Sequence, residues 1–171
     1  MADEAVRTLV GGLHPDRLRA LEISGQVWKD YGFKAYQSAS YPAFDICDAP
    51  LPETFDLVIA EHVFEHLLWP ARAAKNVRQM LSPGGHFLMV TPFMYRVHAD
   101  PHDCTRWTES GMKYFLADCG FPIDTIQTGS WGNRDCVESA FRREYTLFNR
   151  RLHSLENDPT FPVVVWALAA R

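Results

Sequence analysis

Short apolar runs alternate along the chain with stretches whose apolar residues recur every three or four positions. A short apolar run bounded by turn residues is typical of a buried strand, whereas the longer period is that of a helix with one buried face. The runs predict seven strands, at residues 18–24, 33–40, 44–47, 55–60, 86–91, 123–128 and 162–169. Strands that alternate with helices indicate an α/β protein with a mostly parallel sheet.

Four segments have the helical period. The first carries Val6 and Val10 and ends at two glycines, and the second spans residues 70–81, with Pro70 in its first turn. Thr108 is a suitable N-cap for the third, and residues 137–152 form the fourth. No internal repeat or low-complexity segment divides the chain, so residues 1–171 are predicted to form a single domain.

The connections between the first three predicted strands are unusually short. Only residues 25–32 separate the first two strands, whereas a crossover helix between parallel strands needs about a dozen residues. We therefore expect these helices to be shortened or missing, and one face of the sheet to be thinly covered near the amino terminus. An exposed apolar face of this kind favours a partner subunit, such as a second copy in a homodimer.

Composition and charge narrow the class of protein. Of 171 residues 47% are hydrophobic and 22% charged, which is ordinary for a globular domain, and the net charge of −4 argues against nucleic acid as a partner. The longest apolar run, residues 163–170, is far shorter than the ~20 residues of a membrane span, and the acidic start does not resemble a secretion leader. Four scattered cysteines predict free thiols and a cytoplasmic protein.

Polar side chains follow two of the predicted strands at their carboxyl ends. Glu61 and His62 come directly after strand 55–60, and a dense His/Asp/Arg segment, residues 95–107, follows strand 86–91. Open parallel sheets bind ligands at the carboxyl ends of their strands. The sequence therefore predicts a binding site at this edge of the sheet.

Several segments, in order, resemble class I S-adenosylmethionine-dependent methyltransferases: Ala20-Leu-Glu-Ile-Ser-Gly25, Asp48-Ala-Pro-Leu-Pro52, Phe55-Asp-Leu-Val58, Glu65-His66 and Leu81-Ser-Pro-Gly-Gly85. The positions after them are similar to a subgroup associated with sugar and polysaccharide biosynthesis: Pro92-Phe93, His98, His102-Asp103, Arg106, Thr108 and Gly111. The resemblance implies a Rossmann-like, seven-stranded, mostly parallel sheet with S-adenosylmethionine as cofactor. It also implies methylation of a hydroxyl on a sugar or other glycan.

The resemblance also assigns cofactor-binding roles. Glu22 would face the ammonium group of the cofactor across the loop of Ser24 and Gly25, although a lone glycine is also an ordinary turn residue. Asp48, beside Ala49, would accept a hydrogen bond from the adenine amino group, or else be a turn carboxylate before Pro50. Residues 61–63, which are Glu61, His62 and Val63, would line the pocket.

Two departures from the family pattern concern the cofactor. The glycine-rich motif of the family is one glycine short here, with Gln26 at the last position. The acidic residue that usually binds the ribose hydroxyls is replaced by Ser40 or Tyr41. These departures leave open a second function, that of a degenerate methyltransferase fold serving as a binding or regulatory subunit.

The segment after strand 86–91 carries the predicted catalytic groups. Methyl transfer to oxygen needs a base for the hydroxyl proton, and His98 or His102 could serve, because neutral imidazole is available near pH 7. Asp103 could orient a histidine or take the proton itself. The residues predicted to bind substrate are Tyr95, Arg106, Trp107 and Trp131. The alternative is that Asp103 and Arg106 only hold the loop in place and that the tryptophans are core residues.

A third hypothesis for the function is a metal-dependent hydrolase that uses the same segment. His98, Asp100, His102 and Asp103 are ligand types at tight spacing, but no further histidine or aspartate completes a set. No metal site is predicted, although a loosely bound magnesium ion could assist a sugar hydroxyl. The function predicted from the sequence is methyl transfer to a small-molecule or oligosaccharide hydroxyl.

Overall fold

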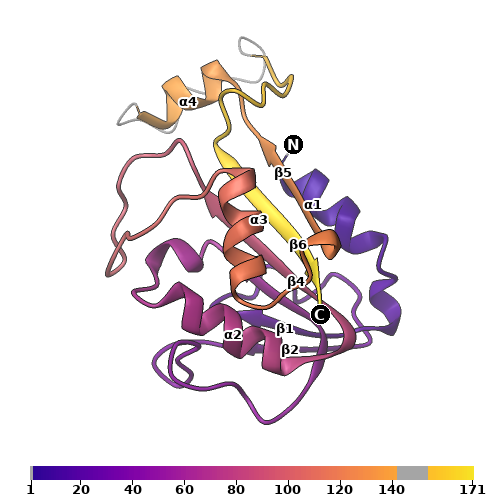
Figure 1. The fold of residues 1–171 in the computed structure, drawn as a ribbon. Coiled ribbons are helices and arrows are strands. Elements are labelled where there is room, and N and C mark those ends of the chain that lie inside the picture. Colours follow the sequence, from indigo (N-terminus) through magenta and orange to yellow (C-terminus); the bar gives the residue numbers. More distant parts are fainter. Residues whose placement is uncertain (1, 142–153) are drawn as a thin grey trace.

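A six-stranded sheet forms the centre of the computed structural model, which describes residues 2–141 and 154–171 (Figure 1). The strands lie in the order β2-β1-β3-β4-β6-β5, and β6 is antiparallel to both of its neighbours, whereas the other pairs are parallel. Their bounds are Arg19–Ile23 for β1, Ala35–Ala39 for β2, Phe55–Glu61 for β3, Leu81–Pro92 for β4, Ile126–Trp131 for β5 and Val164–Ala170 for β6.

The prediction of seven strands was wrong at residues 44–47, which form a turn. The Asp45 side chain accepts a hydrogen bond from the amide of Cys47, and the amide of Asp48 donates to the Asp45 carbonyl. An aspartate that bonds the backbone two residues on favours a turn over a strand. Ile46, the apolar residue behind the strand prediction, still packs in the core with 3% of its surface exposed.

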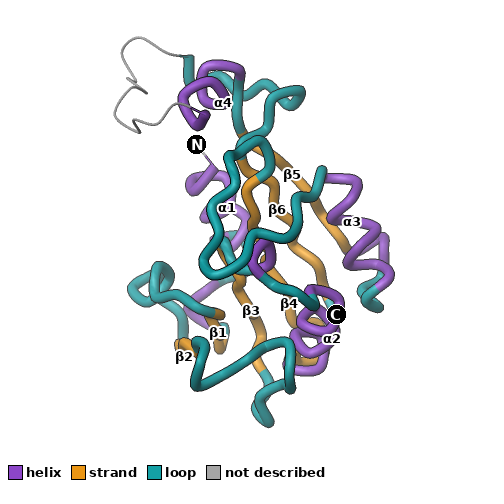
Figure 2. Tube along the Cα trace, turned by 90° about the vertical axis from the view of Figure 1, so that its left-hand side faces the viewer, coloured by secondary structure: helices purple, strands orange, loops and turns teal. Residues whose placement is uncertain are grey.

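Helices cover both faces of the sheet (Figures 1 and 2). The α-helices are α1 (Ala2–Gly11), α2 (Pro70–Met80), α3 (Glu109–Asp118) and α4 (Arg134–Phe141), and short 3-10 helices are η1 (Pro15–Arg17), η2 (Phe64–His66) and η3 (Ile123–Thr125). Thr108 caps α3 as predicted, because its hydroxyl accepts a hydrogen bond from the amide of Gly111. Of the helix predicted at 137–152, residues 142–152 lie outside the described part of the chain.

Buried side chains form two clusters, one on each face of the sheet. Along β3, Val58 and Ala60 pack towards α2 and α3, whereas Leu57 and Ile59 pack towards α1. Alternate residues of a strand point to opposite faces, so a strand covered on both sides is apolar throughout. This explains the run of apolar residues in β3, which only Asp56 interrupts before Glu61.

Aromatic side chains take the place of a helix between β1 and β2. Residues 24–34 form turns and bends, and the rings of Trp28, Tyr31, Phe33 and Tyr36 contact one another in sequence order. Trp28 is only 1% exposed, and the Arg7 guanidinium of α1 lies 4.8 Å from its ring centroid. These rings bury part of what a crossover helix would otherwise cover. The expected thin coverage remains on the other face of β2, where Ala35 and Gln37 are exposed.

Two further findings bear on the sequence predictions. All four cysteines are free thiols. Among the described helices, none combines the length and the apolar composition needed to cross a membrane.

Candidate active site at the carboxyl ends of the strands

The carboxyl ends of β1, β2 and β3 place most of the predicted cofactor residues at one edge of the sheet. Glu22 pairs in register with Ser38 of β2 and with Ile59 of β3, so the residues that follow these strands emerge side by side. Ser24, Gly25 and Ser40 follow β1 and β2, and His62 and Val63 follow β3. Asp48 and Ala49 are exposed in the turns between β2 and β3.

Two residues at this edge have a strained backbone. Ser24 has a φ of 56° and His62 a φ of 55°, which is the left-handed region that residues other than glycine rarely adopt. They follow the adjacent strands β1 and β3. Such strain persists where the surrounding structure enforces it, and it is common where the backbone approaches a ligand.

The Glu22 carboxylate holds the loop between β1 and β2. It is 2% exposed and accepts hydrogen bonds from the amides of Val27 and Trp28, both at 3.0 Å, and from the Tyr36 hydroxyl at 2.6 Å. Three donors on a buried carboxylate compensate the loss of hydration. The carboxylate predicted to face the cofactor therefore also fixes the course of the loop that carries Ser24 and Gly25.

Gly25 lies so close to Glu22 that no side chain fits there. A Cβ atom at this position would stand 2.3 Å from Glu22 Oε1. The single glycine of the shortened motif is thus required for close approach of the loop, which is the role of a glycine in a backbone cradle for a ligand. Trp28 also ties the loop to β3, because its indole N–H donates to Glu61 Oε2 at 2.7 Å.

The Tyr36 hydroxyl makes the stabilising effect of the hydrogen bonds to Glu22 depend on pH. Burial, together with its hydrogen bond to the Glu22 carboxylate, raises the pKa of Tyr36. A raised pKa in the folded state means that the contribution of the hydroxyl to stability is complete below the unfolded pKa of about 10 and is lost as the pH rises above it. We expect Tyr36→Phe to lower the free energy of unfolding by about 1–2 kcal/mol at pH 7. Urea unfolding of both proteins from pH 7 to 11 should show the difference shrinking above pH 10; a constant difference would contradict this.

The long loop after β4 folds back onto η2. The carbonyl oxygen of Glu65 accepts hydrogen bonds from the amides of Cys104 and Thr105, at 2.7 and 3.3 Å, and His66 Nδ1 lies 2.6 Å from the carbonyl oxygen of His102. This brings the predicted catalytic segment to the residues that follow β3. The juxtaposition expected from the parallel sheet is therefore present.

Asp103 and Arg106 pair inside this loop. Both guanidinium NH2 groups donate to the Asp103 carboxylate, one of them at 2.7 Å, and the amide of His98 donates to the same group at 2.8 Å. The hydrogen bonds from Arg106 hold the pKa of Asp103 down at about 2. A carboxylate with so low a pKa is a poor proton acceptor near pH 7, and the pair fits the loop-holding alternative.

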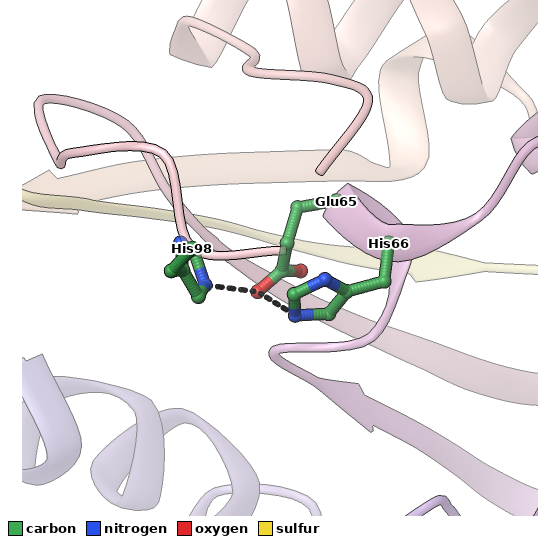
Figure 3. A group of neighbouring side chains, drawn as sticks. All are labelled: Glu65, His66 and His98. Carbon is green, nitrogen blue, oxygen red and sulfur yellow. Dashed lines mark ion pairs between the residues drawn. The ribbon is translucent and has the colours of Figure 1, made fainter. Parts of the chain in front are cut away.

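Three side chains converge where the loop meets η2 (Figure 3). Glu65 Oε1 lies 3.6 Å from His66 Nε2 and 3.9 Å from His98 Nε2. Glu65 is fully buried, and neither of its carboxylate oxygens has a hydrogen-bond partner among the described residues. The ligand atoms of the three side chains lie within 4.8 Å of one another, so the cluster could hold a metal ion.

The other predicted residues are distributed unevenly around this cluster. The Tyr95 ring contacts that of His98, with centroids 5.2 Å apart, whereas the side chain of His102 is exposed. Trp107 is 8% exposed and packs in the core, so little of its ring could stack on a sugar. Trp131 lines a hollow of about 590 Å³ beside α1.

Sequence reasoning missed Glu65 as a site residue. Glu65 and His66 were used only as a motif of the family resemblance. The possible metal ligands considered from the sequence were His98, Asp100, His102 and Asp103. A usable signal was present, because Glu65 is a charged residue inside an otherwise apolar turn, next to Phe64. A buried charge in such a place requires a partner.

Comparisons with known proteins concern the domain family and the fold. Residues 13–89 match the model of a family described as a methyltransferase domain. A solved S-adenosylmethionine-dependent methyltransferase from Mesorhizobium loti shares 18% identity with a TM-score of 0.63, and the match covers 98% of this chain and 96% of that one. No curated protein sequence matches the chain.

Two further solved structures have the same fold. A possible histamine N-methyltransferase from Thermotoga maritima has 12% identity and a TM-score of 0.64, over 96% of this chain and 87% of that one. Phosphoethanolamine N-methyltransferase 2 of Haemonchus contortus, with S-adenosylhomocysteine, has 11% identity and a TM-score of 0.60, over 98% of this chain and 53% of that one.

The fold is that of solved α/β methyltransferases, and the candidate site lies at the carboxyl ends of the strands. The family model matches residues 13–89 only, and the solved structures that share the fold are named as S-adenosylmethionine-dependent methyltransferases or N-methyltransferases.

Proposed function

We propose that this protein transfers the methyl group of S-adenosylmethionine to a hydroxyl of a sugar or another glycan. The observation that carries the proposal is the docking of the loop after β4 onto η2, which brings His98 and His102 to the same edge as the strained residues Ser24 and His62. Methyl transfer needs an electrophile and a nucleophile held in line, with a base nearby. The loop after β1, which carries Gly25, and the loop after β4, which carries the histidines, lie at the same edge of the sheet. They could therefore hold the cofactor and the base close together.

The cofactor would lie along the loop after β1 and the turn after β3. Gly25 provides the close approach, Ser24 and His62 provide the strained backbone, and Glu61 and Val63 border the same turn. The bound cofactor supplies an activated methyl group on sulfur. Ser40 and Asp48, both exposed on the neighbouring β2 side, would reach its ribose and adenine.

The hydroxyl acceptor is supported by the resemblance of residues 92–111 to methyltransferases of sugar biosynthesis. A nitrogen acceptor is the second candidate, favoured by structural neighbours that are named as N-methyltransferases. The two differ chemically, because a neutral hydroxyl must lose its proton to a base such as His102, whereas a neutral amine is already nucleophilic.

An acceptor screen with methyl-tritiated S-adenosylmethionine tests the proposal. We expect label to pass to one or more members of a panel of mono- and oligosaccharides, and turnover to fall at least roughly a hundredfold in His102→Ala, the size of a general-base contribution. That variant should bind S-adenosylhomocysteine normally. Transfer to histamine or ethanolamine but to no saccharide would overturn the hydroxyl acceptor.

A further inference from the structure

Glu65 is a buried carboxylate whose negative charge is not stabilised by any hydrogen bond among the described residues. It has no exposed surface, and neither of its carboxylate oxygens accepts a hydrogen bond. A buried carboxylate without such partners is costly unless a cation neutralises it. The nearest side chains are His62, His66 and His98, whose ring nitrogens lie 3.5, 3.6 and 3.9 Å from Glu65 Oε1.

The hydrogen bonds of His66 fix which of its ring nitrogens carries the proton. Nδ1 lies 2.6 Å from the carbonyl oxygen of His102, which can only accept, so Nδ1 is the protonated nitrogen. A neutral His66 ring then directs the lone pair of Nε2 towards the Glu65 carboxylate. The Nε2 lone pair of His66 and the Glu65 carboxylate then face each other. A cation between them would bind to both groups.

His98 is oriented in the same way. Its Nδ1 lies 3.3 Å from the carbonyl oxygen of Arg96 and 3.3 Å from Asp103 Oδ2, both of them acceptors. The Arg106 guanidinium, a donor 3.4 Å from Nδ1, also donates to Asp103, so two acceptors at 3.3 Å favour a proton on Nδ1 against this one donor. With Nδ1 protonated, Nε2 of His98 directs its lone pair at Glu65. Figure 3 shows a ring nitrogen of each histidine facing the Glu65 carboxylate.

Histidines that bind metals have this arrangement. The ring nitrogen that does not bind the metal donates to a carbonyl or a carboxylate, which fixes the tautomer and turns the other nitrogen to the metal. Two ligands of a tetrahedral zinc ion, each at about 2.0–2.1 Å, stand roughly 3.3 Å apart. The separations of 3.6 and 3.9 Å here are only a few tenths of an ångström longer.

We propose that Glu65, His66 and His98 bind one divalent transition-metal cation of the zinc type. Two imidazoles and one carboxylate suit such an ion better than magnesium, which prefers oxygen ligands. The side chain of His62 is 47% exposed and borders the cluster on its open side, where a fourth ligand or a water molecule could complete the coordination. This inference goes beyond the proposed function and needs neither the cofactor nor the acceptor.

An occupied site would separate the roles of the two candidate bases. The Nε2 lone pair of His98 would be bound to the ion, and His102, whose side chain is exposed, would be the remaining imidazole for the acceptor proton. His98→Ala would then act on metal binding, and His102→Ala on turnover alone.

The test is a calorimetric titration of the chelator-treated full chain with Zn²⁺ and, separately, with Mg²⁺, without cofactor. We expect one Zn²⁺ per chain and at least a hundredfold weaker affinity for Mg²⁺. Glu65→Gln and His98→Asn should each weaken Zn²⁺ binding at least a hundredfold. His102→Ala is the matched control, because it removes a histidine of the same loop whose ring is outside the cluster, and it should bind Zn²⁺ as the wild type does.

Cobalt substitution gives a second readout. Co²⁺ in a site of two imidazoles and one carboxylate should show visible absorption bands that both cluster variants lose and that His102→Ala keeps. Circular dichroism identifies any variant that fails to fold. If Glu65→Gln does not fold, His98→Asn still tests the proposal, because the side chain of His98 is partly exposed. Absence of Zn²⁺ binding by the folded wild type, or unchanged binding in both folded variants, would overturn the proposal. Binding of S-adenosylhomocysteine is measured separately, so failure here leaves the proposed function untouched.

Discussion

Gly25→Ala is expected to weaken binding of S-adenosylhomocysteine at least roughly tenfold, which corresponds to about 1.4 kcal/mol. The added Cβ atom would stand 2.3 Å from Glu22 Oε1, so either the loop after β1 or the carboxylate must move. Either movement displaces the backbone at Ser24, where the cofactor is proposed to bind. Isothermal titration calorimetry measures the loss.

The matched control for this change is Gly11→Ala at the end of α1. A Cβ atom there would meet the Tyr31 hydroxyl at 3.5 Å, which is ordinary van der Waals contact. We expect affinity for S-adenosylhomocysteine to stay within about twofold of the wild type, because α1 lies outside the proposed cofactor loop. Equal affinity of Gly25→Ala and Gly11→Ala would show that the loop after β1 does not contact the cofactor.

Glu22→Gln is expected to lower the free energy of unfolding by about 3 kcal/mol. The carboxylate accepts from Val27, Trp28 and Tyr36, and it is 2% exposed. A glutamine has one oxygen and one NH2 group in its place, so at least one of the three donors would face another donor. Loss of this network should also release the loop, and Trp28 with it, from the sheet.

Urea unfolding at pH 7 gives the measurement. Glu138→Gln is the control, because Glu138 pairs with Arg134 on the surface of α4 with half of its side chain exposed. Such a pair contributes at most about 1 kcal/mol. The double variant Glu22→Gln/Tyr36→Phe should be less destabilised than the sum of the single changes, since both alter the same Glu22–Tyr36 contact. Additivity would mean that the Glu22–Tyr36 contact contributes nothing.

The sequence predicts the strands that the sheet buries on both faces. Residues 55–60 and 86–91 lie in β3 and β4. Strands buried on both faces are mostly apolar, and this pattern can be recognised without knowledge of the rest of the fold. The segment at 44–47 has a similar short apolar pattern. There the side chain of Asp45 bonds the local backbone, and a turn forms instead.

Contacts between distant segments lie beyond what the pattern can predict. Trp28 replaces a helix by packing on α1, and nothing in its own neighbourhood indicates that contact. Glu65 and His98 are 33 positions apart and meet only because the loop after β4 folds back onto η2. The carboxyl-end edge could be predicted because parallel strands end together; the partners within it depend on how the loops close.

The central claim is that the shortened glycine motif still binds the cofactor of a methyltransferase. Calorimetric titration of the full chain with S-adenosylhomocysteine tests it most directly. We expect one bound molecule per chain and an affinity that Gly25→Ala weakens at least roughly tenfold. Absence of any binding by the folded protein at millimolar ligand would contradict the account and leave a methyltransferase fold that serves as a binding subunit.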